Sequence, residues 1–249
     1  MKPNVRWFTY IQIFLLLAMV VGIIGYRSSV LPFSALGLTF AVSLGGLLLV
    51  AAISLGALPV AWFKRHGRLA KHAVVAMVLG GLPLVTMMLM VGAAGFSVPR
   101  IHDISTDTVT PPEFVAAQQE RLATENTLVY GGEALAAQQQ KAYPHIQPYQ
   151  SASDAQQTFS QALATVNQLG WRVIREDAAA GVIEAVEETK VFGFKDDVII
   201  RITPLAFGNQ EGGSRVDVRS VSRVGVSDLG ANAKRIQRYL DRLDANLGG

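Results

Sequence analysis

The chain has 249 residues, room for one or two domains, and a formal net charge of +3. Every acidic residue lies after Pro99, so the preceding part carries seven basic residues and no acidic one, whereas the remainder carries 15 basic and 19 acidic residues. Because the basic excess lies beside apolar segments, the composition argues against a nucleic-acid-binding protein. The chain has no cysteine, which excludes disulfides, thiolate metal sites and a lipidated N-terminal cysteine.

Three uncharged, apolar stretches in the first part are long enough to cross a bilayer as helices. The expected spans cover about residues 7–26, 35–61 and 73–97, within a transmembrane region of residues 1–99. The sequence Gly25-Tyr26-Arg27 is not a small-x-small cleavage site, so the first stretch is predicted to be an uncleaved anchor. No Asp, Glu, Lys, Arg or His lies inside a span, which argues against a transporter or pump.

The basic residues of the short loops predict the orientation of the spans. Lys2 and Arg6 precede the first span, and Arg27 is the basic residue of the first loop. Four more basic residues separate the second span from the third: Lys64, Arg65, Arg68 and Lys71. Because basic loops stay in the cytoplasm, the N-terminus is predicted to be cytoplasmic and the C-terminal part external. In a bacterium with two membranes this describes a multi-pass inner-membrane protein with a periplasmic domain.

Small or kinking residues recur in the second and third spans. They are Ala41, Gly45, Gly46, Gly80, Gly81 and Pro83. Such residues let helix backbones approach closely, so they predict a tight three-helix cluster or a homo-oligomer.

Residues 100–150 read as a linker and wrapping segment. The turn-rich stretch RIHDISTDTVTPPEF opens it. Asp103, Ser105 and Asp107 have the spacing of a calcium loop, but Thr108 stands where glycine is required and Phe114 where the bidentate glutamate is required. An extended segment with local side-chain bonds is therefore favoured over a calcium site.

The rest of this segment gives weaker signals. His102 beside Asp103 could form half of an acid/base pair, but a solvated linker histidine is favoured. Residues 113–140 are expected to form broken helix and loop. Residues 143–149, YPHIQPY, are suited to an edge strand.

Residues 151–249 are predicted to form an α+β domain. A helix is expected to begin at a capping box over residues 153–156 and to end at Gly170. Four strands should follow, over residues 171–175, 182–187, 198–203 and 215–221, and an amphipathic helix should follow them over residues 229–247. The predicted fold class is α+β: three N-terminal transmembrane helices, then an antiparallel sheet with two helices packed on one face, a helix-grip-like arrangement.

The last two strands have one charged face and one apolar face. Arg215, Asp217 and Arg219 alternate with valines on one strand, and Asp197 and Arg201 share a face of the other. The mixture of signs predicts mutual pairing rather than a patch for a strongly charged ligand. Residues 102–114 are expected to cover part of this face.

Charge complementarity motivates that expectation. Asp103 and Asp107 have the sign needed to pair with Arg215 and Arg219. Without a cover, the charged face would be an ordinary solvent-exposed ladder.

Two further patterns leave alternatives open. Asp196 and Asp197, beside Lys195, could bind a metal as paired carboxylates. A surface ion-pair ladder with Arg201 and Arg219 is favoured, because charges of both signs across a sheet tend to pair with one another.

The stretch GVSDL at residues 225–229 resembles a nucleophile elbow, but Leu229 replaces the closing glycine and no histidine follows. Ser227 is instead predicted to cap the last helix. Arg223 and that helix start could hold an anion, which Asp228 would repel.

Several separated motifs carry a resemblance to a known family. STDTVTPPEF at residues 105–114, Gly170-Trp171, VFGFKDDVIIRI at residues 191–202 and SRVDVRSVSRVGVSDLGANAKRI at residues 214–236 resemble the family called domain of unknown function 1499. The resemblance covers about Pro99 to Leu247, with Lys190-Val191-Phe192 where that family has Arg-Trp or Arg-Phe. It implies no activity, so it assigns no catalytic residue. The order of elements is also similar to helix-grip domains of outer-membrane barrel-assembly lipoproteins, a likeness of fold pattern alone.

The sequence favours a non-catalytic domain that binds a protein or lipid of the cell envelope. The expected partners are the lipid bilayer and an envelope protein or second copy of the chain, with no nucleic acid, cofactor or metal. The candidate interaction residues are His102, Asp103, Asp107, Asp196, Asp197, Arg201, Arg215, Asp217, Arg219, Arg223 and Asp228. The alternative is a membrane-tethered enzyme that uses His102, Asp103, Asp196 and Asp197 as an acid/base or metal set. Convergence of those four in one pocket would favour the enzyme.

Overall fold

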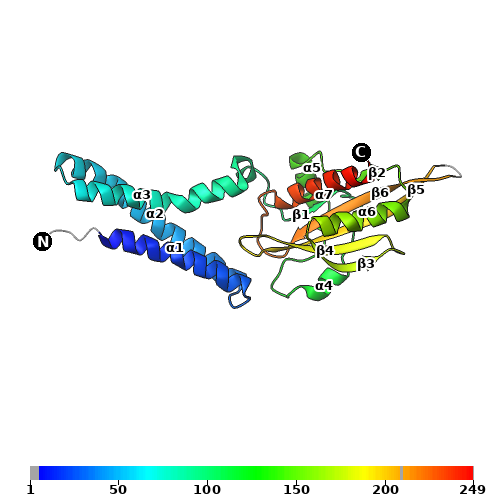
Figure 1. Cartoon of the computed structure of the whole chain (residues 1–249), viewed down its shortest axis with the longest axis horizontal. Helices are drawn as coiled ribbons and strands as arrows, with labels where there is room; N and C mark the ends of the chain where they lie inside the picture. Colours follow the sequence, from blue (N-terminus) through cyan, green and yellow to red (C-terminus); the bar gives the residue numbers. More distant parts are fainter. Residues whose placement is uncertain (1–5, 208–209, 249) are drawn as a thin grey trace. The chain divides into compact units, whose positions relative to one another are not determined.

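A computed structural model describes residues 6–207 and 210–248, and the chain divides into two compact units. One comprises the chain up to Ala94 with Val191–Gly193, and the other comprises Gly95–Lys190 with Phe194–Gly249. The first unit is built from long helices, and the second from a sheet with helices on it (Figure 1).

Three long helices make up the first unit: α1 (Arg6–Arg27), α2 (Phe33–Phe63) and α3 (Gly67–Val91). Each is long and apolar enough to cross a membrane, as the sequence predicts. The third helix differs from its expected bounds, because it begins at Gly67 and takes in Arg68 and Lys71. It ends at Val91, before a short 3-10 helix, η1 (Ala93–Phe96). Lys2, used in the orientation argument, lies outside the described residues.

Close packing occurs at only some of the small residues. At Gly80 of α3 an added Cβ would lie 2.9 Å from the carbonyl oxygen of Leu47 on α2, so only glycine fits. At Gly46 of α2 an added Cβ would lie 2.8 Å from the Leu15 side chain of α1. Gly45 and Gly81 face open space, so the prediction of tight packing is right for one glycine of each pair.

A buried glutamine that the sequence analysis passed over joins α1 to α3. The side chain of Gln12 is fully buried, and its Nε2 donates to the carbonyl oxygen of Ala76 at 2.7 Å. In an apolar surrounding an interhelical hydrogen bond of this kind holds two helices at a fixed offset.

The sheet of the second unit is antiparallel throughout. Its strands are β1 (Asp103–Ser105), β2 (Tyr149–Ser151), β3 (Arg172–Asp177), β4 (Val182–Glu188), β5 (Lys195–Phe207) and β6 (Gln210–Ser222). The order across the sheet is β1-β6-β5-β4-β3, and β2 also pairs with β6. The predicted α+β class with an antiparallel sheet is confirmed. The expected edge strand over residues 143–149 is wrong in position, because β2 begins only at Tyr149.

Two helices, α6 (Ala155–Gln168) and α7 (Ala231–Leu247), cover one face of this sheet (Figure 1). Their apolar stripes pack on the inward residues of the central strands, which alternate with the charged positions. Trp171 stacks on Tyr239 in this core with ring centroids 5.5 Å apart. α6 ends at Gln168, and Gly170 just beyond it has the left-handed conformation that the sequence predicts, with φ of 73°.

The caps of both helices differ from their predicted positions. Asp154 rather than Ser153 caps α6, because its carboxylate accepts from the backbone N–H of Gln157 at 2.7 Å. The Oγ of Ser227 accepts only from Leu229 N, and α7 begins at Ala231. The N-cap position of α7 is Gly230, and the Asp228 carboxylate accepts from the backbone N–H groups of Gly230 and Asn232 at the helix start.

The opposite face of the sheet is covered by residues 106–130, here called the covering segment. It contains the short helix α4 (Ala116–Glu120) and is followed by α5 (Gly132–Ala142). Phe114 and Ala117 of this segment form a small core with Ile199 and Val221 of the sheet. The sheet therefore lies between a helical layer and an irregular one, and the charged strand face is enclosed.

Candidate functional site

The enclosed charges form what we call the ionic layer: the charged side chains of β4, β5 and β6 that face the covering segment, with their partners. Alternation along the strands places Asp197 and Arg201 of β5 on this face with Arg215, Asp217 and Arg219 of β6. Asp197, Asp217 and Arg219 are at most 1 % exposed. Buried charges require partners, so the layer is a set of paired groups.

Arg219 is the largest of the fully buried side chains in the ionic layer. Its Nε and Nη2 donate to the two carboxylate oxygens of Asp103 at 3.0 and 2.8 Å, a bidentate pair. Its Nη1 donates to Pro112 O at 3.0 Å and its Nη2 to Leu128 O at 2.8 Å. The side chain therefore ties β1 and two points of the covering segment to β6.

Two aromatic rings flank this guanidinium. Its central carbon lies 5.3 Å from the ring centroid of Phe114 and 5.2 Å from that of Tyr130, within cation–π range. Burial, with the negative charge of Asp103, raises the pKa of Tyr130 to about 12.

A second cluster centres on Asp107 of the covering segment. Its Oδ2 accepts from Arg201 at 3.1 Å and from Arg215 at 3.0 Å. The same two arginines donate to Asp217, at 2.9 Å from Arg201 and 3.0 Å from the Nη2 of Arg215. Each of the two arginines thus pairs with both aspartates, so the four charges balance. Of the four side chains, only the arginines are substantially open to solvent.

Asp107 also organises its own loop. Its carboxylate accepts from the backbone N–H groups of Val109 and Thr110 and from the Thr110 hydroxyl. Burial opposes ionisation, but these hydrogen bonds and the charge of Arg215 outweigh it and lower the pKa of Asp107. An aspartate bonded in this way has no role as a calcium ligand of the one-three-five pattern.

The third cluster centres on Asp197. Its carboxylate accepts from Arg121 Nε at 2.7 Å and from Arg223, whose shortest bond is also 2.7 Å. Arg223 reaches on to Glu120 at 3.1 Å, and Glu120 forms a bidentate pair with Arg172 at 2.9 and 2.7 Å. The hydrogen bond from Arg172, with that from Arg223, lowers the pKa of Glu120 to about 2.

Sequence reasoning missed several members of the layer, among them Glu120, Arg121 and Glu184. Glu184 of β4 is fully buried and accepts from three backbone N–H groups at the start of α4, those of Val115, Ala116 and Ala117, at 3.0, 3.1 and 3.0 Å. A glutamate from a strand thus satisfies the helix end that would otherwise have no side-chain cap. The alternation of Glu184 with Ile183 and Ala185 was the available signal.

Asp196 points to the other face of the sheet, away from the ionic layer. It pairs with Arg235 of α7, which also contacts Glu187 of β4. Burial opposes the charge on Arg235, but the two carboxylates outweigh it and raise its pKa. Because neighbouring residues of a strand face opposite sides, Asp196 and Asp197 do not form a carboxylate pair for a metal.

His102 and Asp228 lie near the start of α7. The carbonyl oxygen of His102 accepts from Asn232 Nδ2 at 2.9 Å, and His102 belongs to the chain that enters β1 rather than to a solvated linker. Asp228 accepts from the N–H groups of Gly230 and Asn232 at 2.8 and 2.9 Å. Burial raises its pKa. The helix start suggested as an anion site is already filled by this carboxylate.

The structure separates the four residues of the enzymatic alternative. Asp103 is bound by Arg219, Asp197 by Arg121 and Arg223, and Asp196 by Arg235 on the opposite face. Within the described residues no group of three or more histidine, aspartate and glutamate side chains is placed to hold a metal. The expected surface ladder is also wrong, because the layer is enclosed, whereas the predicted Asp103 and Asp107 pairings are present, with Arg219 and Arg215 respectively.

The fold and the ionic layer together define a small α+β domain that follows an apolar three-helix unit. Buried charge pairs join its covering segment to its sheet. Residues 103–243 match the family model described as protein of unknown function, DUF1499. The match covers more than half of the chain, so the protein belongs to this family, and the resemblance of the sequence motifs is confirmed. No curated protein matches the chain.

Proposed function

We propose that the protein is a multi-pass inner-membrane protein that displays its α+β domain in the periplasm as a non-catalytic module for binding an envelope protein or lipid. The three apolar helices support membrane insertion. The excess of basic residues between α2 and α3 over the first loop supports a cytoplasmic N-terminus and an external domain.

The observation that carries the non-catalytic part is the mutual pairing of the ionic layer. A general acid, base or nucleophile needs access to substrate and a pKa near the working pH. The most buried carboxylates of the layer are instead bound by arginines or backbone N–H groups: Asp197, Asp217 and Glu184. The pKa of Asp107 and that of the more exposed Glu120 are lowered, so these two carboxylates stay ionised at neutral pH. The pairings of the layer hold the covering segment in place.

The outer side of the covering segment is the proposed partner surface. It exposes four large aliphatic side chains, while its inner side is buried on the sheet: Val109, Val115, Leu122 and Val129. Single exposed aliphatics are ordinary, but a group of them on one segment is typical of a surface that binds an apolar partner. The charge pairs beneath hold this irregular segment rigid, which lowers the entropy cost of binding.

Two measurements test the proposal. A reporter that matures only outside the cytoplasm, fused after Gly249, should be active; activity of a cytoplasmic reporter at the same point would reverse the placement. Separately, a photo-crosslinking residue at Val129 should capture a discrete partner in cells. The same residue at Gln157 on α6, also exposed, should not. Identical adducts from both positions, or none from Val129, would remove the covering segment as the partner surface.

A further inference from the structure

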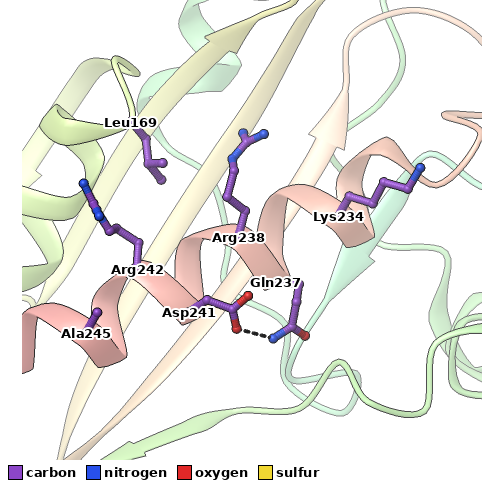
Figure 2. Close-up of a pocket in the computed structure, with 7 residues that line it drawn as sticks. All are labelled: Leu169, Lys234, Gln237, Arg238, Asp241, Arg242 and Ala245. Carbon is purple, nitrogen blue, oxygen red and sulfur yellow. Dashed lines mark hydrogen bonds between the residues drawn. The ribbon is translucent and has the colours of Figure 1, made fainter. Parts of the chain in front are cut away.

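A hollow of about 570 Å³ lies on the outer side of α7, apart from the ionic layer and from the covering segment. Its wall on the α6 side is Leu169, and its long side is formed by Lys234, Arg238 and Arg242 (Figure 2). It is a shallow depression open to solvent rather than an enclosed cavity.

The three basic residues form a row. They recur every fourth position of one helix, so they lie on one face and about 6 Å apart along the axis. Figure 2 shows Arg238 and Arg242 reaching to the side where Leu169 lies. Asp241 lines the same hollow and accepts from Gln237 at 2.6 Å, so among the described lining residues one acidic side chain accompanies the three basic ones.

Each arginine of the row is held by one hydrogen bond that leaves it donors to spare. Arg238 Nη2 donates to Glu187 at 2.5 Å, and Arg242 Nε donates to Gln168 at 2.9 Å. A guanidinium has five N–H donors, so these bonds orient the side chains without exhausting them. Arg238 remains about half exposed.

The lining also has an apolar component. Leu169, Ala245 and the carbon stems of the long basic side chains supply it, with the charged heads at the rim. An inorganic anion would satisfy only the rim, whereas an amphipathic anion would cover both parts. The domain as a whole carries more acidic than basic residues, which disfavours an extended polyanion such as a nucleic acid.

We propose that this hollow binds an anionic phospholipid, with the phosphate on the row of Lys234, Arg238 and Arg242 and part of an acyl chain against Leu169. The proposal rests on the binding role proposed above and names the lipid class. Lipid is favoured over an acidic polypeptide because the hollow accommodates one chain rather than a standard protein interface, and because three bilayer-length apolar helices bring the protein into contact with lipid.

The test uses the full chain in an uncharged detergent. Binding of dioctanoyl phosphatidylglycerol, dioctanoyl phosphatidylcholine, inorganic phosphate and polyglutamate is measured by thermophoresis, each at low and high salt. The variant is Lys234→Gln with Arg242→Gln; Arg238 is kept because it contacts Glu187, which also holds Arg235. The matched control, Lys141→Gln with Lys195→Gln, removes the same charge from exposed positions outside the hollow.

The anionic lipid should bind more tightly than the zwitterionic one, and less tightly as salt rises. The hollow variant should lose about 30-fold in affinity, since each basic residue near an anionic lipid contributes about fivefold. The control should bind as the parent does. A thermal melt checks folding, and Leu169→Gln supplies a second variant that should weaken lipid but leave inorganic phosphate binding unchanged.

Three results would overturn the inference: equal affinity for the two lipids, equal losses in variant and control, or tighter binding of phosphate or polyglutamate than of the anionic lipid. The last would assign a free anion or an acidic polypeptide to the hollow. None of these results bears on the reporter or on capture at Val129, so failure of the lipid site and failure of the proposed function are separable.

Discussion

Replacement of Arg219 by alanine should destabilise the second unit far more than loss of an ordinary surface ion pair. The substitution removes both bonds to Asp103 and the donors to Pro112 O and Leu128 O. It leaves the Asp103 carboxylate, 5 % exposed, without its arginine. Breaking a buried pair in this way costs about 3–5 kcal/mol in the free energy of unfolding, because a buried charge is left uncompensated.

The measurement is urea unfolding of the full chain in mild detergent, followed through Trp171 fluorescence. Trp171 is buried in the helical core of the second unit, and Trp7 and Trp62 are replaced by phenylalanine in every variant to isolate its signal. The control is Arg172→Ala, because the side chain of Arg172 is 56 % exposed in its pair with Glu120. An exposed pair contributes about 0.2–1 kcal/mol.

A double variant separates the charge from the packing. Arg219→Met with Asp103→Leu replaces the pair by apolar groups, which is often close to neutral, so it should recover most of the loss. A loss below about 1 kcal/mol for Arg219→Ala, no greater than that for the Arg172 control, would refute the assignment of a buried, organising charge pair. A double variant as unstable as Arg219→Ala would place the effect in packing against Phe114 and Tyr130 instead.

Three further predictions concern acid, helix packing and domain independence. The pKa of Glu120 is about 2 in the folded protein, against 4.5 ordinarily, so its pairing stabilises the fold above about pH 4.5 and this stabilisation is lost as the pH falls toward 2. Glu120→Gln should therefore make the free energy of unfolding less dependent on pH in this range. An acid-unfolding curve that is unchanged in the variant would contradict the prediction. Gly80→Ala should cost about 1–3 kcal/mol by overpacking against the Leu47 carbonyl, whereas Gly81→Ala, in open space, should not lower the melting temperature in detergent; equal effects would refute the packing. A chain beginning at Arg100 should be soluble and unfold cooperatively, and insolubility would show that it depends on the apolar helices.

Periodicity predicted the framework of the molecule well. The three apolar stretches, the alternating strands and the amphipathic α7 each repeat one signal over many residues, so a local error changes little. Their ends were predicted less well. Asp154 caps α6 where Ser153 was expected. At the start of α7, Asp228 rather than Ser227 accepts from the N–H groups of Gly230 and Asn232.

The ionic layer shows where sequence reasoning runs out. Complementary charge correctly paired Asp103 and Asp107 with arginines of β6, since β1 and the covering segment carry acidic residues at the same spacing as the basic residues of that strand. Arg121 and Glu184 gave no such signal. Their partners lie 76 residues away, at Asp197, and 67 to 69 residues away, at the start of α4. Only the folded topology brings these groups together.

The charge pairs of the ionic layer fix the position of the covering segment on the sheet, an effect distinct from their contribution to stability. Apolar side chains of similar volume would hold the covering segment at least as firmly. They would not fix its position, because an irregular segment packed on an apolar face can slide along it. Each arginine of the layer instead meets a partner at a defined place: Arg219 at Asp103 and at two carbonyls, Arg215 at Asp107. A shift by one residue would leave buried charges unpaired. The layer therefore fixes which side chains of the covering segment face outward, and with them the surface offered to a partner.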